Sequence, residues 1–180
     1  MSSNKLKNNT TNWVLSALFL ALAIVLPLFT GQLQELGNKI LPMHIPVLLC
    51  GFLCGPIFGT IVGFISPLLR FTLFGMPTIF PIGITMCFEL ATYGLVSGYL
   101  YNILPKRNSS IYISLITSML IGRVIWGISN LIIYGVSNSA FGWQAFITGA
   151  FINAFIGIII QILIIPLLVI KLETIFCSHT

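Results

Sequence analysis

The stretch from Leu41 to Pro81 places the strongest constraint on the fold, because it is almost entirely apolar yet is broken by prolines and glycines at short intervals. Arg70 is its one permanently charged residue. So long an apolar run is foreign to a water-soluble core, whereas a simple membrane anchor needs no such series of helix breakers. We therefore interpret the stretch as two tightly joined membrane helices, flanked by structured loops on one face of the bilayer.

The composition of the whole chain supports a membrane location. Hydrophobic residues make up 57% of the 180 residues and charged residues only 6%, whereas soluble domains carry roughly a quarter charged residues. Since a helix needs about 20 apolar residues to cross the hydrocarbon core, the length accommodates about six crossings and no separate soluble domain. We predict an all-α membrane protein with six transmembrane helices, forming a single domain over residues 1–180.

The hydropathy pattern predicts where the six helices lie. The expected ranges are Thr11–Phe29, Pro42–Cys54, Ile57–Leu73, Ile79–Leu104, Ile111–Gly135 and Trp143–Ile170. The second helix is short for a complete span, and the Gly55-Pro56 pair predicts a tight turn after it. Lys5 and Lys7 precede the first helix as they would in a signal peptide, but the length of the apolar run favours a retained membrane helix.

The positions of the basic residues predict the orientation in the membrane. Six crossings place both termini on the same side, and most basic residues fall on that side: Lys5, Lys7, Lys106, Arg107 and Lys171. Because cytoplasmic loops carry an excess of lysine and arginine, we predict that both termini are cytoplasmic. The segments 30–41, 74–78 and 136–142 are then expected to face outward.

Two charged residues lie deep inside predicted helices. Glu89 belongs to the fourth helix and Arg123 to the fifth, each roughly 15–20 Å below the outer surface at a rise of 1.5 Å per residue. Charges at such depth are costly, so they usually serve function or pair with each other. The sequence leaves both interpretations open: Glu89 and Arg123 contact a ligand, or they form a structural ion pair.

Polar residues recur along one face of each of three consecutive predicted helices. The faces comprise Glu89 and Tyr93 on the fourth helix, Arg123, Trp126, Asn130 and Tyr134 on the fifth, and Gly149, Asn153, Gly157 and Gln161 on the sixth. Helices that line a common cavity show this pattern. We predict a pocket, open to the outside, for a small polar molecule that stacks on aromatic rings and bonds to the amides. Either Arg123 or Arg70 is a candidate for binding a carboxylate or phosphate.

The remaining reactive residues predict neither catalysis nor a bound metal. His44, at the outer start of the second helix, either faces the pocket or caps the helix, and it has no metal ligand at the usual spacing. The cysteines read as small packing residues. The chain has no aspartate and His44 has no evident serine partner, so an enzyme is not expected. No nucleotide-binding or cofactor motif is present, so any ATP must be hydrolysed by another protein.

Several motifs together resemble the substrate-binding S components of energy-coupling factor (ECF) vitamin transporters, over essentially the whole chain. They are the short second helix entered by MHIPVLLCGF, the GP turn, GFISPLLR, the loop FGMPTIFP, FELATYGLVSGYLY and GRVIWG. The resemblance implies a six-helix protein that binds a vitamin or related micronutrient from outside. It also implies partners, a transmembrane coupling protein and two ABC-type ATPases that hydrolyse the ATP. The family's AxxxA face, which contacts the coupling protein, is matched by Ala17 and Ala21.

The resemblance leaves the substrate open. The MHIP motif is most similar to members associated with pantothenate, whose carboxylate two arginines would suit, and a pyridoxine-type vitamin would suit the aromatic residues. Some riboflavin-type members have an acidic residue near the position of His44, which speaks against riboflavin. The alternative function is that of a small secondary transporter or channel that works alone, for which Glu89 is the one buried acid available to a coupling ion.

Overall fold

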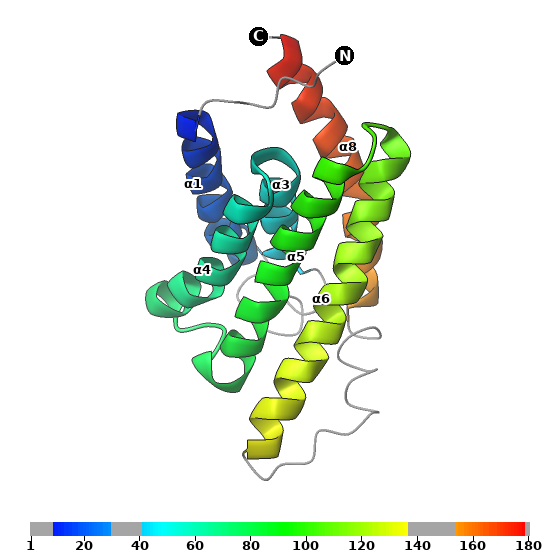
Figure 1. Ribbon diagram of the computed structural model, residues 1–180. Coiled ribbons are helices and arrows are strands. Elements are labelled where there is room, and N and C mark those ends of the chain that lie inside the picture. Colours follow the sequence, from blue (N-terminus) through cyan, green and yellow to red (C-terminus); the bar gives the residue numbers. More distant parts are fainter. Residues whose placement is uncertain (1–8, 30–40, 137–153, 179–180) are drawn as a thin grey trace.

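The computed structural model describes residues 9–29, 41–136 and 154–178, and these residues form helices and turns (Figure 1). The chain order is α1 (Asn9–Val25), η1 (Leu26–Leu28), α3 (His44–Cys54), α4 (Pro56–Phe74), η2 (Ile79–Gly83), α5 (Ile84–Ile103), α6 (Asn108–Val136) and α8 (Phe155–Ser178). No strand occurs in these three segments, so the prediction of an all-helical protein is confirmed for them.

Five of the described helical segments are long and apolar enough to cross a membrane: Thr10–Leu28, Pro56–Phe74, Ile79–Ile103, Asn108–Tyr134 and Phe155–Thr174. Helix α3 has 11 residues, which corresponds to about 16 Å of helix, roughly half the thickness of the hydrocarbon core. The multi-pass membrane character is therefore confirmed. Six complete crossings and the cytoplasmic location of both termini stay predictions.

The fourth helix was predicted to begin at Ile79, five residues before the regular α-helix begins. Regular helix begins at Ile84, after the irregular turn η2, in which Phe80 has the extended backbone angles φ −110° and ψ 130°. The cause is Pro81, because a proline disfavours helical geometry in the residue before it. The hydropathy of this stretch stays high across the break, so hydropathy does not reveal where the helix begins.

The ends of two other predicted helices also differ from the structure. Helix α6 begins at Asn108 rather than Ile111, and α8 continues to Ser178, beyond the predicted end at Ile170. Both differences occur where polar residues prolong a helix past its apolar span. The predicted start of the last helix at Trp143 lies outside the described residues.

Helix α5 lies at the centre of the described bundle, in contact with α3, α4 and α6 (Figure 1). Its contact with α4 is made through glycines, since a Cβ atom at Gly59 would lie 2.8 Å from the carbonyl oxygen of Gly94. A Cβ atom at Gly63 would likewise overlap the backbone at Leu90. Glycine is required here because only a residue without a side chain lets two helix backbones approach so closely. Helices α3, α4 and α5 therefore form one tight block.

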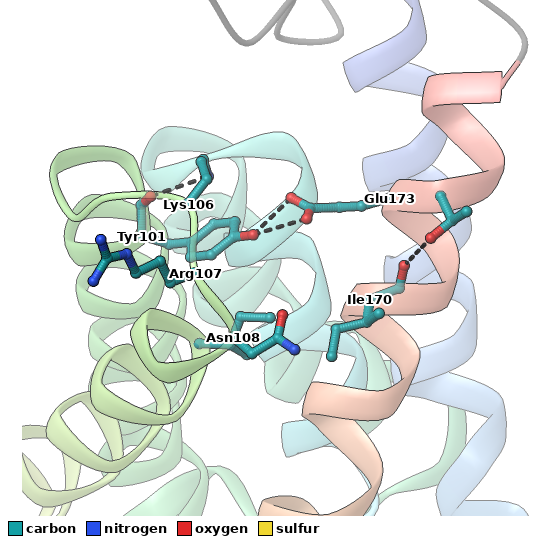
Figure 2. Close-up of a pocket in the computed structure, with 8 residues that line it drawn as sticks. Tyr101, Lys106, Arg107, Asn108, Ile170 and Glu173 are labelled. Carbon is teal, nitrogen blue, oxygen red and sulfur yellow. Dashed lines mark hydrogen bonds between the residues drawn. The ribbon is translucent and has the colours of Figure 1, made fainter. Parts of the chain in front are cut away.

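The turn between α5 and α6 is tied to the end of α8 (Figure 2). The Tyr101 hydroxyl donates to Glu173, 2.8 Å from each carboxylate oxygen. The Lys106 Nζ donates to the Tyr101 carbonyl oxygen at 3.1 Å and lies 3.2 Å from the centre of the Tyr101 ring. The start of α1 is at the same end of the bundle (Figure 1). Lys106, Arg107 and Lys171 thus share one end, as predicted.

Candidate ligand-binding site

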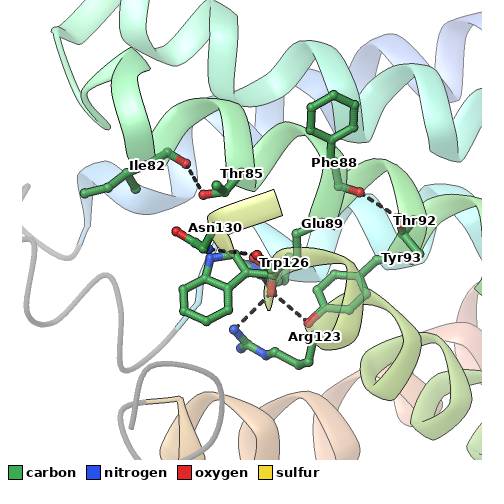
Figure 3. A network of polar contacts seen from close by, with 10 residues as sticks. Ile82, Thr85, Phe88, Glu89, Thr92, Tyr93, Arg123, Trp126 and Asn130 are labelled. Carbon is green, nitrogen blue, oxygen red and sulfur yellow. Dashed lines mark hydrogen bonds and ion pairs between the residues drawn. The ribbon is translucent and has the colours of Figure 1, made fainter. Parts of the chain in front are cut away.

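Glu89 is the centre of a buried polar cluster between α3, α5 and α6. Its Oε1 lies 3.0 Å from Nη1 of Arg123 on α6. The Tyr93 hydroxyl, one turn further along α5, donates to the same oxygen at 3.0 Å. Figure 3 shows the side chains of Glu89 and Tyr93 directed towards Arg123. The two charged residues that the sequence places at similar depth therefore do meet, as an ion pair.

His44 joins this cluster from the first position of α3. Its Nε2 is 3.6 Å from Glu89 Oε1, and its ring lies tilted against the Tyr93 ring with 5.2 Å between centroids. The residue is only 2% exposed, and no side chain caps the start of α3. His44 therefore faces Glu89 rather than capping its helix, and its contact with a ligand stays a prediction. We call His44, Glu89, Tyr93 and Arg123 the Glu89 cluster.

The Glu89 cluster has more hydrogen-bond donors than acceptors. One carboxylate oxygen, Glu89 Oε1, faces three neighbours. Within the described residues, Nε and Nη2 of Arg123 have no hydrogen-bond partner, and neither ring nitrogen of His44 has one. Each buried polar atom left without a partner costs about 1–3 kcal/mol, and more when it is charged. A carboxylate, carbonyl or phosphate group placed beside Arg123 and His44 would satisfy these donors.

The remaining candidates on α6 extend away from the Glu89 cluster. Asn130 is buried, and its Nδ2 donates to the Trp126 carbonyl oxygen at 2.8 Å (Figure 3). Trp126 and Tyr134 are half-buried. Tyr134 lies 11 residues beyond Arg123, about 16 Å along the helix. The predicted α6 face is therefore directed inward, but only its Arg123 end contacts Glu89.

Arg70 and Asn153 are not part of the described cluster. Arg70 lies near the end of α4, seven residues beyond Gly63, which packs at the level of Leu90. It is only 6% exposed, and its Nε donates to the Met76 carbonyl oxygen at 3.2 Å. Its buried Nη1 has no hydrogen-bond partner in the described segments. The side chain therefore holds the turn after α4 rather than pointing to the membrane surface. Asn153 lies outside the described residues.

Two residues that the sequence did not single out as site residues stand out in the structure. Gln161 on α8 is fully buried, and neither of its amide atoms has a hydrogen-bond partner among the residues that the structure describes. It shares the buried face of α8 with Ile165 and Val169. Gly122 precedes Arg123, and a Cβ atom there would overlap the Tyr93 ring. The sequence signal for Gln161 was its place on the face of the sixth predicted helix with Gly149, Asn153 and Gly157, at four-residue spacing; Gly122 gave none.

Comparison with known proteins gives one match. The family model for the ECF transporter substrate-specific component matches residues 12–169. No curated protein and no solved structure shows a significant similarity to the chain. The match spans α1 to α8 and contains every described residue of the Glu89 cluster. Among the described residues, no group of three or more His, Cys, Asp or Glu side chains is placed to hold a metal ion.

Proposed function

The chain belongs to the family of ECF transporter substrate-specific components, and from this premise we propose that it captures a vitamin or related micronutrient at the Glu89 cluster. Membership of the family makes it the substrate-capture subunit of an ECF importer, a multi-pass membrane protein that acts with a transmembrane protein and ATPases. The choice of vitamin and of the residues that bind it belongs to the proposal.

The observation that carries the proposal is the surplus of buried donors around Glu89. In the described part of the chain, Arg123 retains two nitrogens without a hydrogen-bond partner beside a carboxylate that already faces His44 and Tyr93. A purely structural ion pair is expected to satisfy its remaining donors, because a buried charge with free donors is costly. A ligand with a hydrogen-bond acceptor would satisfy the remaining donors of Arg123.

The chemistry of the cluster favours a substrate with a carboxylate, for which pantothenate is the first candidate. Arg123 offers Nε and Nη2, which lie on the same edge of the guanidinium and match a carboxylate in a bidentate arrangement. A pyridoxine-type vitamin is the second candidate, since Tyr93 and the half-buried Trp126 offer ring surfaces for stacking. We propose that Asn130, Arg70 and Tyr134 also contact the ligand, and Asn153, which lies outside the described residues, stays a candidate for the same role.

Partner binding is assigned to the outer face of α1. Ala17 and Ala21 are exposed there, four residues apart. Small residues at this spacing allow a second helix to approach closely. We propose that this face contacts the transmembrane coupling protein, whose associated ATPases supply the energy. The chain itself then needs no cofactor.

The test is the identity of the retained ligand. The protein, purified in mild detergent, is denatured and the released small molecules are identified by mass spectrometry, and pantothenate and pyridoxine are then titrated into the ligand-free protein. We expect submicromolar binding of one of them and co-purification with the ATPases. Uptake that persists without ATP in a host lacking every ECF partner would overturn the proposal in favour of a secondary transporter.

A further inference from the structure

A cavity lies at the opposite end of α5 from the Glu89 cluster (Figure 2). Its volume is about 530 Å³. It lies between the α5–α6 turn and the end of α8, and the residues lining it are Tyr101, Lys106, Arg107, Asn108, Ile111, Ile170, Glu173 and Thr174. Tyr101 is 12 residues from Glu89, about 18 Å along the helix. The cavity is therefore separate from the candidate substrate site.

Positive charges outnumber negative charges around this cavity. Lys106 and Arg107 are adjacent on its rim, and both are exposed. The one acidic residue, Glu173, accepts the Tyr101 hydroxyl with both oxygens. The Lys106 ammonium is held in place by the Tyr101 carbonyl and ring, whereas the Arg107 guanidinium has no hydrogen-bond or ion-pair partner in the described part of the chain. The rim thus has one cation held in place, Lys106, and one that can turn towards a ligand, Arg107.

Two apolar side chains also line the cavity. Ile111 is buried, and Ile170 contributes an exposed side chain from α8. The turn joins two helices that are long and apolar enough to span the membrane, so the cavity opens where the bilayer meets water. A cationic rim above apolar side chains at that depth is complementary to a group that is anionic at one end and aliphatic at the other.

We propose that this cavity binds a phosphate ester, with the phosphate at Lys106 and Arg107 and the ester chain on Ile111 and Ile170. An anionic phospholipid and a soluble phosphate ester share this chemistry. A guanidinium binds phosphate through two parallel hydrogen bonds, and a lysine binds it as a point charge. Occupancy ties the α5–α6 turn more firmly to α8, next to the Tyr101–Glu173 hydrogen bond.

The test compares lipid retention by the full chain in nanodiscs of phosphatidylcholine with and without phosphatidylglycerol. Retained lipid is counted by native mass spectrometry for the unaltered protein and for Arg107→Gln. The matched control is Lys171→Gln, which removes the same charge at the same end of the bundle without touching the cavity lining. We expect Arg107→Gln to lower phosphatidylglycerol retention about fivefold and the control to change it little, since one basic residue near a surface contributes about 1 kcal/mol.

A second arm distinguishes the two sources of the phosphate. Glycerol phosphate and inorganic phosphate are titrated against the protein in phosphatidylcholine nanodiscs, with thermal stability as the readout. Stabilisation by glycerol phosphate that Arg107→Gln abolishes, without any preference for phosphatidylglycerol, assigns the cavity to a soluble ester. Equal losses in Arg107→Gln and Lys171→Gln, or no response to any phosphate compound, overturn the proposal. Substrate affinity, measured in parallel, reports whether each variant is folded.

Discussion

The ring of Tyr93 on α5 fills the space beside Gly122 on α6 that a side chain at position 122 would otherwise occupy. With the ring in this place, the Tyr93 hydroxyl lies 3.0 Å from Glu89 Oε1. The neighbouring residue on α6 is Arg123, which binds the same oxygen. One glycine therefore sets the position of the two groups that hold the Glu89 carboxylate.

Gly122→Ala is expected to displace the Tyr93 ring and weaken ligand binding. The hydrogen bond to Glu89 is then lost, and hydrogen bonds to charged groups contribute about 1.5–3 kcal/mol, so affinity should fall at least about tenfold. Isothermal titration with the identified ligand measures the change. The control is Ile121→Ala, at an exposed neighbouring position. Unchanged affinity in Gly122→Ala would mean that the position of Tyr93 does not matter for binding.

Substitutions of Glu89 and Arg123 separate a structural pair from a ligand site. Glu89→Gln or Arg123→Gln alone leaves one charge buried without its partner, which typically costs about 3–5 kcal/mol of stability. The double variant Glu89→Gln/Arg123→Gln removes both charges and should regain much of the thermal stability. We expect the double variant to fold yet bind ligand at least a hundredfold more weakly, a loss of about 3 kcal/mol. Full affinity in the double variant would show that the pair is structural only.

Gln161→Leu is expected to change stability and affinity in opposite directions. The fully buried amide has no hydrogen-bond partner among the described residues, and replacing an unsatisfied polar group by an apolar one of similar shape is neutral or stabilising. The melting temperature should therefore rise. If the amide contacts the ligand, as we expect, affinity falls several-fold in the same variant. A higher melting temperature with unchanged affinity would exclude Gln161 from the ligand site.

Arg70→Gln tests whether the C-terminal end of α4 takes part in binding. The substitution removes the hydrogen bond from Arg70 Nε to the Met76 carbonyl oxygen and the charge that Nη1 offers. We expect affinity for a carboxylate ligand to fall about tenfold, because the ligand loses a charge-assisted hydrogen bond from Nη1. Thr72→Val serves as the exposed control on the same helix. Binding that survives Arg70→Gln intact would leave this part of the chain as scaffold.

Ala17→Trp and Ala21→Trp are expected to disrupt assembly without affecting ligand capture. Both positions are exposed on α1, so the larger side chains can be accommodated in the isolated protein but prevent close approach of a partner helix. The amount of ATPase that co-purifies with the protein should fall several-fold, while ligand affinity in detergent stays the same. Ile132→Trp, on the exposed face of α6, is the control for added bulk. Undiminished co-purification would show that the coupling protein binds elsewhere.

The sequence predicted the helical bundle well because apolar runs and helix breakers are local properties. It also predicted that Glu89 and Arg123 lie at the same depth, because the rise per residue places both at a similar distance along their helices. Pairing was one expected outcome, since a charge inside a membrane helix needs a partner and few are available. It did not predict that His44 contacts Glu89, because that contact depends on the depth in the membrane at which the short helix α3 begins. The break at Phe80 was missed because the hydropathy of the stretch is high on both sides of Pro81.

The seam of glycines between α4 and α5 restricts how a protein of this architecture acquires a new specificity. At Gly59, Gly63 and Gly94, even one methyl group would overlap backbone atoms of the neighbouring helix. Substitutions that reshape the ligand site are therefore excluded along this seam, whereas side chains on α6 and α8 can change without separating the two helices. Evolution towards a different substrate has to act through α6, α8 and the loops, with the α4–α5 seam inherited unchanged.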